Sequence, residues 1–181
     1  MFAFVIAAAL SLPTLPPAEY ADTEVVTNVA LSCGIASGDS VSNLSQVVGV
    51  DITQELCQAM PSGSGFANWE TTALATLRAI RMGDATNFVA NSTPGMLSRE
   101  FEVVATNAVS VPATFTQAFS LTSSEFSRYR VTAYAVTTNS PGRVCVDINV
   151  LLRRGDSQND IPETLNLSLI KTNDVWKVDG L

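Results

Sequence analysis

The stretch RYRVTAYAVTTNSPGRVCVDINVLLRR, Arg128–Arg154, decides the fold. Hydrophobic and polar residues alternate on both sides of NSPG, Asn139–Gly142, and a period of two is typical of strands that bury one face. Because Pro and Gly favour tight turns, the two runs predict an antiparallel hairpin. The second strand, Arg143–Arg153, carries one row of residues for a core: Val144, Val146, Ile148, Val150 and Leu152.

The same period continues on either side of this hairpin. After the polar loop RGDSQNDIP, hydrophobic and polar residues alternate through Leu165, Leu167 and Leu169, and Val175–Val178 is a closing strand. Upstream, one more strand is predicted, with a face formed by Phe115, Gln117, Phe119 and Leu121. Together these segments predict a meander of four or five strands.

Helical spacing precedes the strands. Between residues 66 and 90, hydrophobic residues recur every three or four positions, which predicts an amphipathic helix. The apolar stripe consists of Phe66, Trp69, Ala73, Leu77 and Ile80. Gly83 suits the left-handed position that ends this helix, and Asp84 can cap a second, short one. Residues 95–105 fit a helix and a strand equally. Helices followed by a meander indicate the α+β class.

The length of 181 residues favours one main domain. PSGSG, Pro61–Gly65, is a clear break in the pattern. We therefore predict three parts. Residues 1–21 form an export signal or partial membrane anchor with a Pro-rich linker, residues 22–65 a disulfide-stapled extension with a short helix capped by Thr53, and residues 66–181 the α+β domain.

The amino terminus suggests export. MFAFVIAAALSL, Met1–Leu12, is an apolar run closed by Pro13. It is shorter than the roughly 20 residues that a transmembrane helix needs, and its length suits the hydrophobic region of an export signal. A longer upstream segment would make it a membrane anchor, and a buried strand or helix is the structural alternative. We expect an extracytoplasmic protein, secreted or membrane-tethered.

Cysteine usage is compatible with export. Cys33 and Cys57 bracket a stretch rich in Gly, Ser and Asn, and a disulfide between them would restrict the unfolded chain. Two unrelated buried thiols are the alternative. Cys145 lies in a strand-like run and is expected to be free.

Composition excludes several classes of function. Ten basic and seventeen acidic residues give a net charge of −7, so no basic field exists to hold phosphate backbones, and we expect no nucleic-acid partner. The chain has no histidine, which excludes Ser-His-Asp and Cys-His nucleophiles and zinc sites that need imidazole. We find no glycine-rich phosphate loop and no acidic calcium loop. We therefore expect no cofactor, no metal and no catalytic residue.

Asp147 is the best candidate for a catalytic acid or base, because it interrupts an apolar strand. The alternation places it opposite the valines, and an outward, solvated carboxylate is expected to titrate near its ordinary pKa. Tyr129 and Tyr134 fall on opposite faces of their strand, so at most one of them could assist it. Ordinary packing explains both tyrosines, and we predict that the protein is not an enzyme.

Several exposed motifs have simple explanations. Arg128 and Arg130 share a strand face and could bind an anion, but they also suit a role in keeping that face soluble. Arg154–Asp156 reads RGD, an adhesion tripeptide, and a solvated turn explains it equally. Three N-x-S/T sequons, which would carry glycans only after a eukaryotic secretory route, begin at Asn43, Asn91 and Asn166.

The order of these elements resembles the nuclear-transport-factor-2-like (cystatin-like) superfamily. The segment LNLSLIKTNDVWKVDGL, Leu165–Leu181, looks like the final hairpin of bacterial envelope proteins with this fold. These are the periplasmic scaffold domains of type IV secretion and conjugation systems and the mammalian-cell-entry-associated proteins. The resemblance covers Phe66–Leu181 and implies helices packed in the concave face of a strongly bent antiparallel sheet, a cystatin-like cone. Enzymes of the superfamily use Asp, His or Tyr in that cone, and without His the Asp–His pairing does not carry over.

The resemblance implies an exported, non-catalytic protein-interaction domain of a bacterial envelope, conjugation or secretion assembly. Its partners would be proteins, with homo-oligomerisation left open and membrane contact limited to an amino-terminal anchor. The alternative is a cone-fold protein that binds a small apolar molecule, or acts on it as an isomerase or cyclase. A third reading is a secreted lone domain. A scaffold should fill its cone with its own Phe and Trp side chains, whereas a binder needs an open pocket with at least two convergent polar groups.

Overall fold

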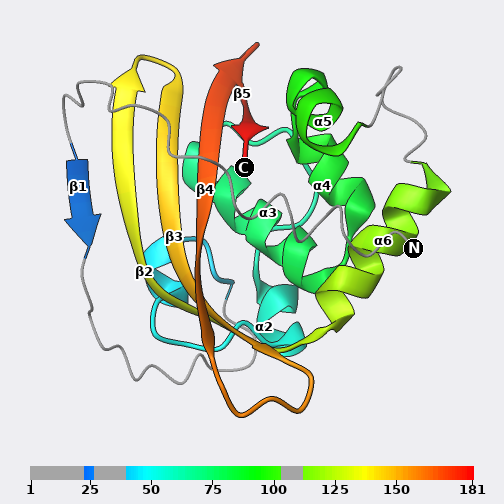
Figure 1. Ribbon diagram of the computed structural model, residues 1–181. Coiled ribbons are helices and arrows are strands. Elements are labelled where there is room, and N and C mark those ends of the chain that lie inside the picture. The colour runs from blue at the N-terminus through cyan, green and yellow to red at the C-terminus, as the bar shows by residue number, and fades with distance from the viewer. Residues whose placement is uncertain (1–22, 27–39, 103–111) are drawn as a thin grey trace.

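The computed structural model describes residues 23–26, 40–102 and 112–181. It contains helices and an antiparallel sheet with strand order β1-β2-β3-β4-β5 (Figure 1). The strands are β1 (Thr23–Val26), β2 (Phe126–Ser140), β3 (Arg143–Arg154), β4 (Ile161–Thr172) and β5 (Val175–Gly180). The helices are the 3-10 helix η1 (Leu44–Val47), α2 (Gln54–Ala59), α3 (Trp69–Met82), α4 (Ala85–Asn91), α5 (Pro94–Phe101) and α6 (Ala113–Ser124). The α+β class is confirmed.

The predicted hairpin is the centre of the sheet. Strands β2 and β3 pair along almost their whole length, from Phe126 opposite Arg154 to Ser140 opposite Arg143. The turn between them needs a left-handed residue, which Gly142 supplies at φ +79°. The even-numbered row of β3, from Val144 to Leu152, is at most 4% exposed, as the alternation predicted.

Thr53, Gly83 and Asp84 cap helices as the sequence predicted, and the structure adds Asn68 as the residue at which α3 begins. The Asn68 side chain accepts a hydrogen bond from the Thr71 N–H at 2.8 Å and caps α3, and Gly83 ends this helix at φ +64°. Asp84 accepts from the Asn87 N–H at 3.1 Å and caps α4. Thr53 caps α2 in the same way, through the Leu56 N–H at 3.1 Å. In the ambiguous range 95–105, α5 shows that the chain is helical as far as Phe101.

The strand predicted over residues 115–121 is wrong, because this segment is helix α6. Phe115 and Phe119 are four positions apart, so they share a face in a helix as well as in a strand. Both rings pack on Phe88, with ring centroids 6.4 and 4.9 Å away, whereas Leu121 is 58% exposed. Contacts with α4 therefore select the helical period.

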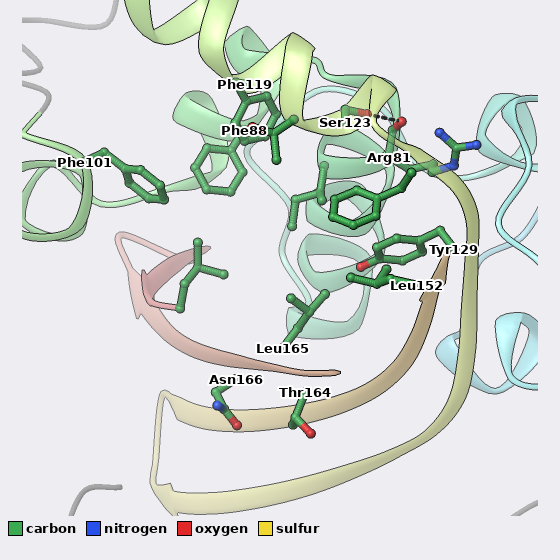
Figure 2. A pocket seen from close by; sticks show the side chains of 14 residues that line it. Arg81, Phe88, Phe101, Phe119, Ser123, Tyr129, Leu152, Thr164, Leu165 and Asn166 are labelled. Atoms are coloured by element: carbon green, nitrogen blue, oxygen red, sulfur yellow. Dashed lines mark hydrogen bonds between the residues drawn. The ribbon is translucent and has the colours of Figure 1, made fainter. Parts of the chain in front are cut away.

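The helices lie on the concave side of the sheet, whose long strands curve around them (Figures 1 and 2). Residues before the Pro61–Gly65 break share the same core as the later helices and strands, among them Val41, Leu44, Val47, Ile52 and Cys57. The boundary at residue 65 stays a prediction. The proposed signal or anchor, residues 1–21, lies outside the described residues. Within the described ranges, no helix combines the length and the apolar character needed to cross a bilayer.

Candidate functional site

A cavity of about 160 Å³ lies between the helices and the concave face of the sheet (Figure 2). Most of the side chains that line it are apolar. The aromatic ones are Phe88, Phe101, Phe119, Phe126 and Tyr129, and the aliphatic ones are Ile80, Leu152, Leu165 and Leu181. Helices α3 to α6 and strands β2 to β4 all contribute to the lining, so the cavity depends on the complete α+β packing.

One wall of the cavity is aromatic because α4, α5 and α6 each direct a phenylalanine toward the same place. The Phe88 ring meets the edge of Phe101 at 5.6 Å between centroids and lies 4.9 Å from the ring of Phe119. Phe115 stands behind them, 5.5 Å from both Phe101 and Phe119. Edge-to-face and tilted pairs of this kind add attraction beyond the area that they bury.

Tyr129 supplies the one free hydroxyl of the lining. Its side chain comes from β2, is 4% exposed, and directs the oxygen toward the middle of the cavity (Figure 2). Among buried side-chain atoms of the described residues, only Tyr129 Oη and Asn91 Oδ1 lack a hydrogen-bond partner, and Asn91 does not line the cavity. Burial raises the pKa of Tyr129 far above its ordinary value, so the phenol keeps its proton at every physiological pH.

The backbone on both sides holds Tyr129 in place. Its carbonyl accepts a hydrogen bond from the Ile52 N–H at 2.6 Å, and its partner in the β-ladder is Leu152. The Ile52 carbonyl in turn accepts from Arg81 Nε at 2.9 Å. Ile52 therefore holds the backbone of β2 at Tyr129 and is itself held by Arg81. These bonds fix the position from which the Tyr129 side chain extends.

The other hydroxyls of the lining are already engaged. Ser123 Oγ donates to the Arg81 carbonyl at 2.5 Å, and Thr122 Oγ1 donates to the Ala118 carbonyl at 3.0 Å. On β4, Leu165 points into the cavity, while Thr164 and Asn166 lie on the opposite side of the strand (Figure 2). The site is therefore an apolar chamber with a single unpartnered O–H group.

Asp147 lies outside this chamber. It is exposed on the outer face of β3, opposite Asn166 of β4, which confirms that it faces away from the valines. We expected an ordinary pKa for Asp147. Partial burial by neighbouring groups instead desolvates this carboxyl and raises its pKa. The structure does not bring Asp147 and Tyr129 together.

The prediction that Tyr129 and Tyr134 lie on opposite faces is wrong. The ladder of β2 shifts register between Val131 and Ala133, and such a bulge reverses the alternation beyond it. Tyr129 therefore pairs with Leu152 and Tyr134 with Ile148, which both belong to the buried row of β3. Tyr134 is 9% exposed and does not line the cavity.

Both arginines of β2 contact other parts of the same chain. Of the two roles that the sequence allowed, Arg128 takes the binding of a carboxylate, within the protein itself. Arg128 forms ion pairs at 3.0 Å with both Asp51 and Asp160, and Arg130 donates to the Gly49 carbonyl. Gly49 and Asp51 directly precede Ile52, whose N–H bonds to the Tyr129 carbonyl, so these contacts support the site. They leave the arginines committed to the protein itself.

The remaining motifs have local structural roles. Arg154 of the RGD sequence pairs with Glu125, and the Gly155 N–H donates to the Glu125 carbonyl at 3.0 Å. Among the sequons, Asn43 caps η1 and Asn91 is fully buried, while Asn166 lies within β4. Asn91 cannot carry a glycan in this fold, because its amide is enclosed.

Cys57 is buried, and Cys145 is partly buried on β3. Cys33 lies outside the described residues, so its disulfide with Cys57 stays a prediction. In the reduced protein, burial raises the pKa of the Cys57 thiol to about 11, against an opposing effect of Arg81 and Arg78. Such a thiol stays protonated and unreactive near neutral pH.

We expect this raised pKa to make the reduced protein sensitive to alkali. Stability from the protonated Cys57 thiol is fully present below about pH 9 and is lost as pH rises through about 11. The loss amounts to roughly 2–3 kcal/mol at most. Urea denaturation at a series of pH values measures it, with Cys57→Ala as the control that removes the thiol. Equal pH slopes in the two proteins would contradict this expectation.

The described residues contain no group of three or more His, Cys, Asp or Glu side chains that could hold a metal ion. No family model, curated protein or solved structure matches this chain. Its function is therefore inferred from the cavity and its lining.

Proposed function

We propose that this protein binds a small, largely apolar molecule inside the chamber between α3–α6 and the sheet. The observation that carries the proposal is the mostly apolar cavity of about 160 Å³ between the helices and the sheet. An apolar cavity of about 150 Å³ in another protein stays dry and takes up benzene, so a molecule with a single ring fits here. The aromatic wall offers such a ring edge and face contacts.

The arrangement of the fold supports this proposal. Helices in the curve of an antiparallel sheet are what a nuclear-transport-factor-2-like, cystatin-like cone would have, and the closing hairpin at Leu165–Leu181 is part of that resemblance. In such a cone the space between helix and sheet is the natural place for a ligand. The proposal is binding without catalysis, because Asp147 of β3 lies on the opposite face of the sheet from Tyr129 of β2.

An exported protein-interaction domain of a bacterial envelope, conjugation or secretion assembly is the second proposal. One observation favours it: Phe88, Phe101, Phe115 and Phe119 fill one end of the space inside the sheet with the protein's own rings. Against it, an apolar volume remains beside those rings. Among the buried polar groups of the lining, Tyr129 alone is free, whereas a binder was expected to have two convergent polar groups, so a ligand would be held mainly by apolar contacts.

Ligand titration of the full chain tests the binding proposal. With acetophenone as the probe, nuclear magnetic resonance of the backbone amides should show saturable shifts at Phe88, Tyr129 and Leu165. Leu165→Phe should weaken binding at least tenfold by filling the chamber, whereas Leu121→Phe, on the exposed face of α6, should leave it unchanged. Shifts that do not saturate, or an unaffected Leu165→Phe variant, would favour the scaffold proposal.

A further inference from the structure

The hydroxyl of Tyr129 is unusual because it is buried among apolar side chains and has no hydrogen-bond partner. A buried polar group without a hydrogen bond costs free energy, and most such groups in folded proteins are paired. A leucine or phenylalanine would fit the surrounding side chains without that cost. The free hydroxyl therefore suggests that its partner comes from outside the chain.

Water is a poor partner at this position. A buried water molecule typically makes about three hydrogen bonds, and it needs two to four polar groups around it. Here Ser123 and Thr122 already donate to backbone carbonyls, and Thr164 donates to Asn149 Oδ1 at 2.9 Å. Thr164 and Asn166 belong to the lining, but their side chains lie on the exposed side of β4. Apart from Arg81, the other lining residues are rings and aliphatic side chains. A molecule that brings both an apolar body and one oxygen atom suits the site better.

The charge of that molecule also follows from the lining. Arg81 is the charged residue that lines the chamber, and its Nε donates to the Ile52 carbonyl while its guanidinium points away from the rings (Figure 2). A carboxylate in the chamber would lose its water without gaining a directed cation. A neutral oxygen needs only one donor, which the Tyr129 O–H provides.

We infer that the ligand is a neutral ring compound with a carbonyl oxygen, and that Tyr129 selects it by donating a hydrogen bond to that oxygen. This inference rests on the proposed binding function and adds the chemical class of the ligand. Tyr129 acts here as a specificity residue in the binding step, with no bond made or broken.

A matched pair of probes separates the hydrogen bond from the shape of the ligand. Acetophenone and α-methylstyrene have nearly the same outline, and differ in that the C=O of the first is a C=CH₂ in the second. In Tyr129→Phe, acetophenone should bind about 3- to 10-fold more weakly, the range expected for one neutral hydrogen bond, while the affinity for α-methylstyrene should not fall. The infrared C=O stretch of bound acetophenone should lie at lower frequency in the wild type than in the variant.

Tyr129→Phe should fold normally, because it removes an unpartnered hydroxyl and keeps the ring. Its thermal midpoint should equal or exceed that of the wild type, which separates lost binding from lost structure. Benzoate, the anionic relative, should bind more weakly than acetophenone at pH 7. Tighter binding of benzoate would overturn the neutral character of the ligand.

The outcomes distinguish the two proposals. If neither acetophenone nor α-methylstyrene binds, the binding function itself fails and this inference fails with it. If both bind and Tyr129→Phe weakens neither, or weakens both equally, the chamber is a binding site but its hydroxyl does not select the ligand. An unchanged C=O frequency in the variant would likewise overturn the hydrogen bond.

Discussion

Replacing Phe88 by Ala should lower the free energy of unfolding by about 3–5 kcal/mol, the range for large aromatic side chains in cores. Phe88 is 1% exposed and contacts the rings of Phe101, Phe115 and Phe119. These neighbours belong to α5 and α6. Because two separate helices carry them, they cannot move together to fill the cavity that the lost Phe88 ring would leave. Urea denaturation followed by circular dichroism measures the loss.

Leu121→Ala is the matched control for Phe88. Leu121 lies on α6, next to the same aromatic cluster, but is 58% exposed, and an exposed site of this kind usually changes stability by less than about 0.5 kcal/mol. A loss below about 1 kcal/mol for Phe88→Ala, or equal losses in the two variants, would show that the four rings do not form the packed centre described above.

Trp176→Ala should also cost about 3–5 kcal/mol. Trp176 is 9% exposed on the closing strand β5, and its backbone N–H donates to the Phe66 carbonyl at 2.9 Å. Trp69 belongs to the predicted apolar stripe of α3, but it is the first residue of that helix and only partly buried. Trp69→Ala should therefore cost clearly less.

The two tryptophan variants can be compared directly by urea denaturation. Each substitution removes the same indole, so the difference in the free energy of unfolding reports the difference in burial. Near-ultraviolet circular dichroism of the two proteins shows whether the remaining indole keeps its packing. Equal losses would mean that Trp69 contributes to the core as much as Trp176 does.

Local signals in the sequence were enough for much of the fold. The hairpin around Gly142 and the end of α3 at Gly83 were predicted correctly, because strand alternation, turn residues and helix caps act within a few positions along the chain. The outward direction of Asp147 followed from the same alternation, since β3 pairs with both neighbours without a bulge at that point.

Local signals could not decide the secondary structure of segments whose hydrophobic residues fit both the strand period and the helix period. Phe115 and Phe119 fit one face of a strand and one face of a helix, and the rings of α4 and α5 select the helix. Tyr134 turned to the buried side because of a bulge near Thr132. A bulge has no strong local signal, since it depends on how the partner strand curves around the core.

The candidate site was the least predictable part. Tyr129 was singled out only as a helper for Asp147, and its free hydroxyl becomes visible only when the chamber around it is assembled. The sequence by itself determined the α+β class, the central hairpin and the helix caps at Thr53, Gly83 and Asp84, because these depend on neighbouring residues. Only the tertiary structure decided the fold of residues 113–124, the faces of the tyrosines and the existence of the cavity. Those features depend on contacts between elements far apart along the chain, such as Phe88 with Phe119 and Tyr129 with Leu152.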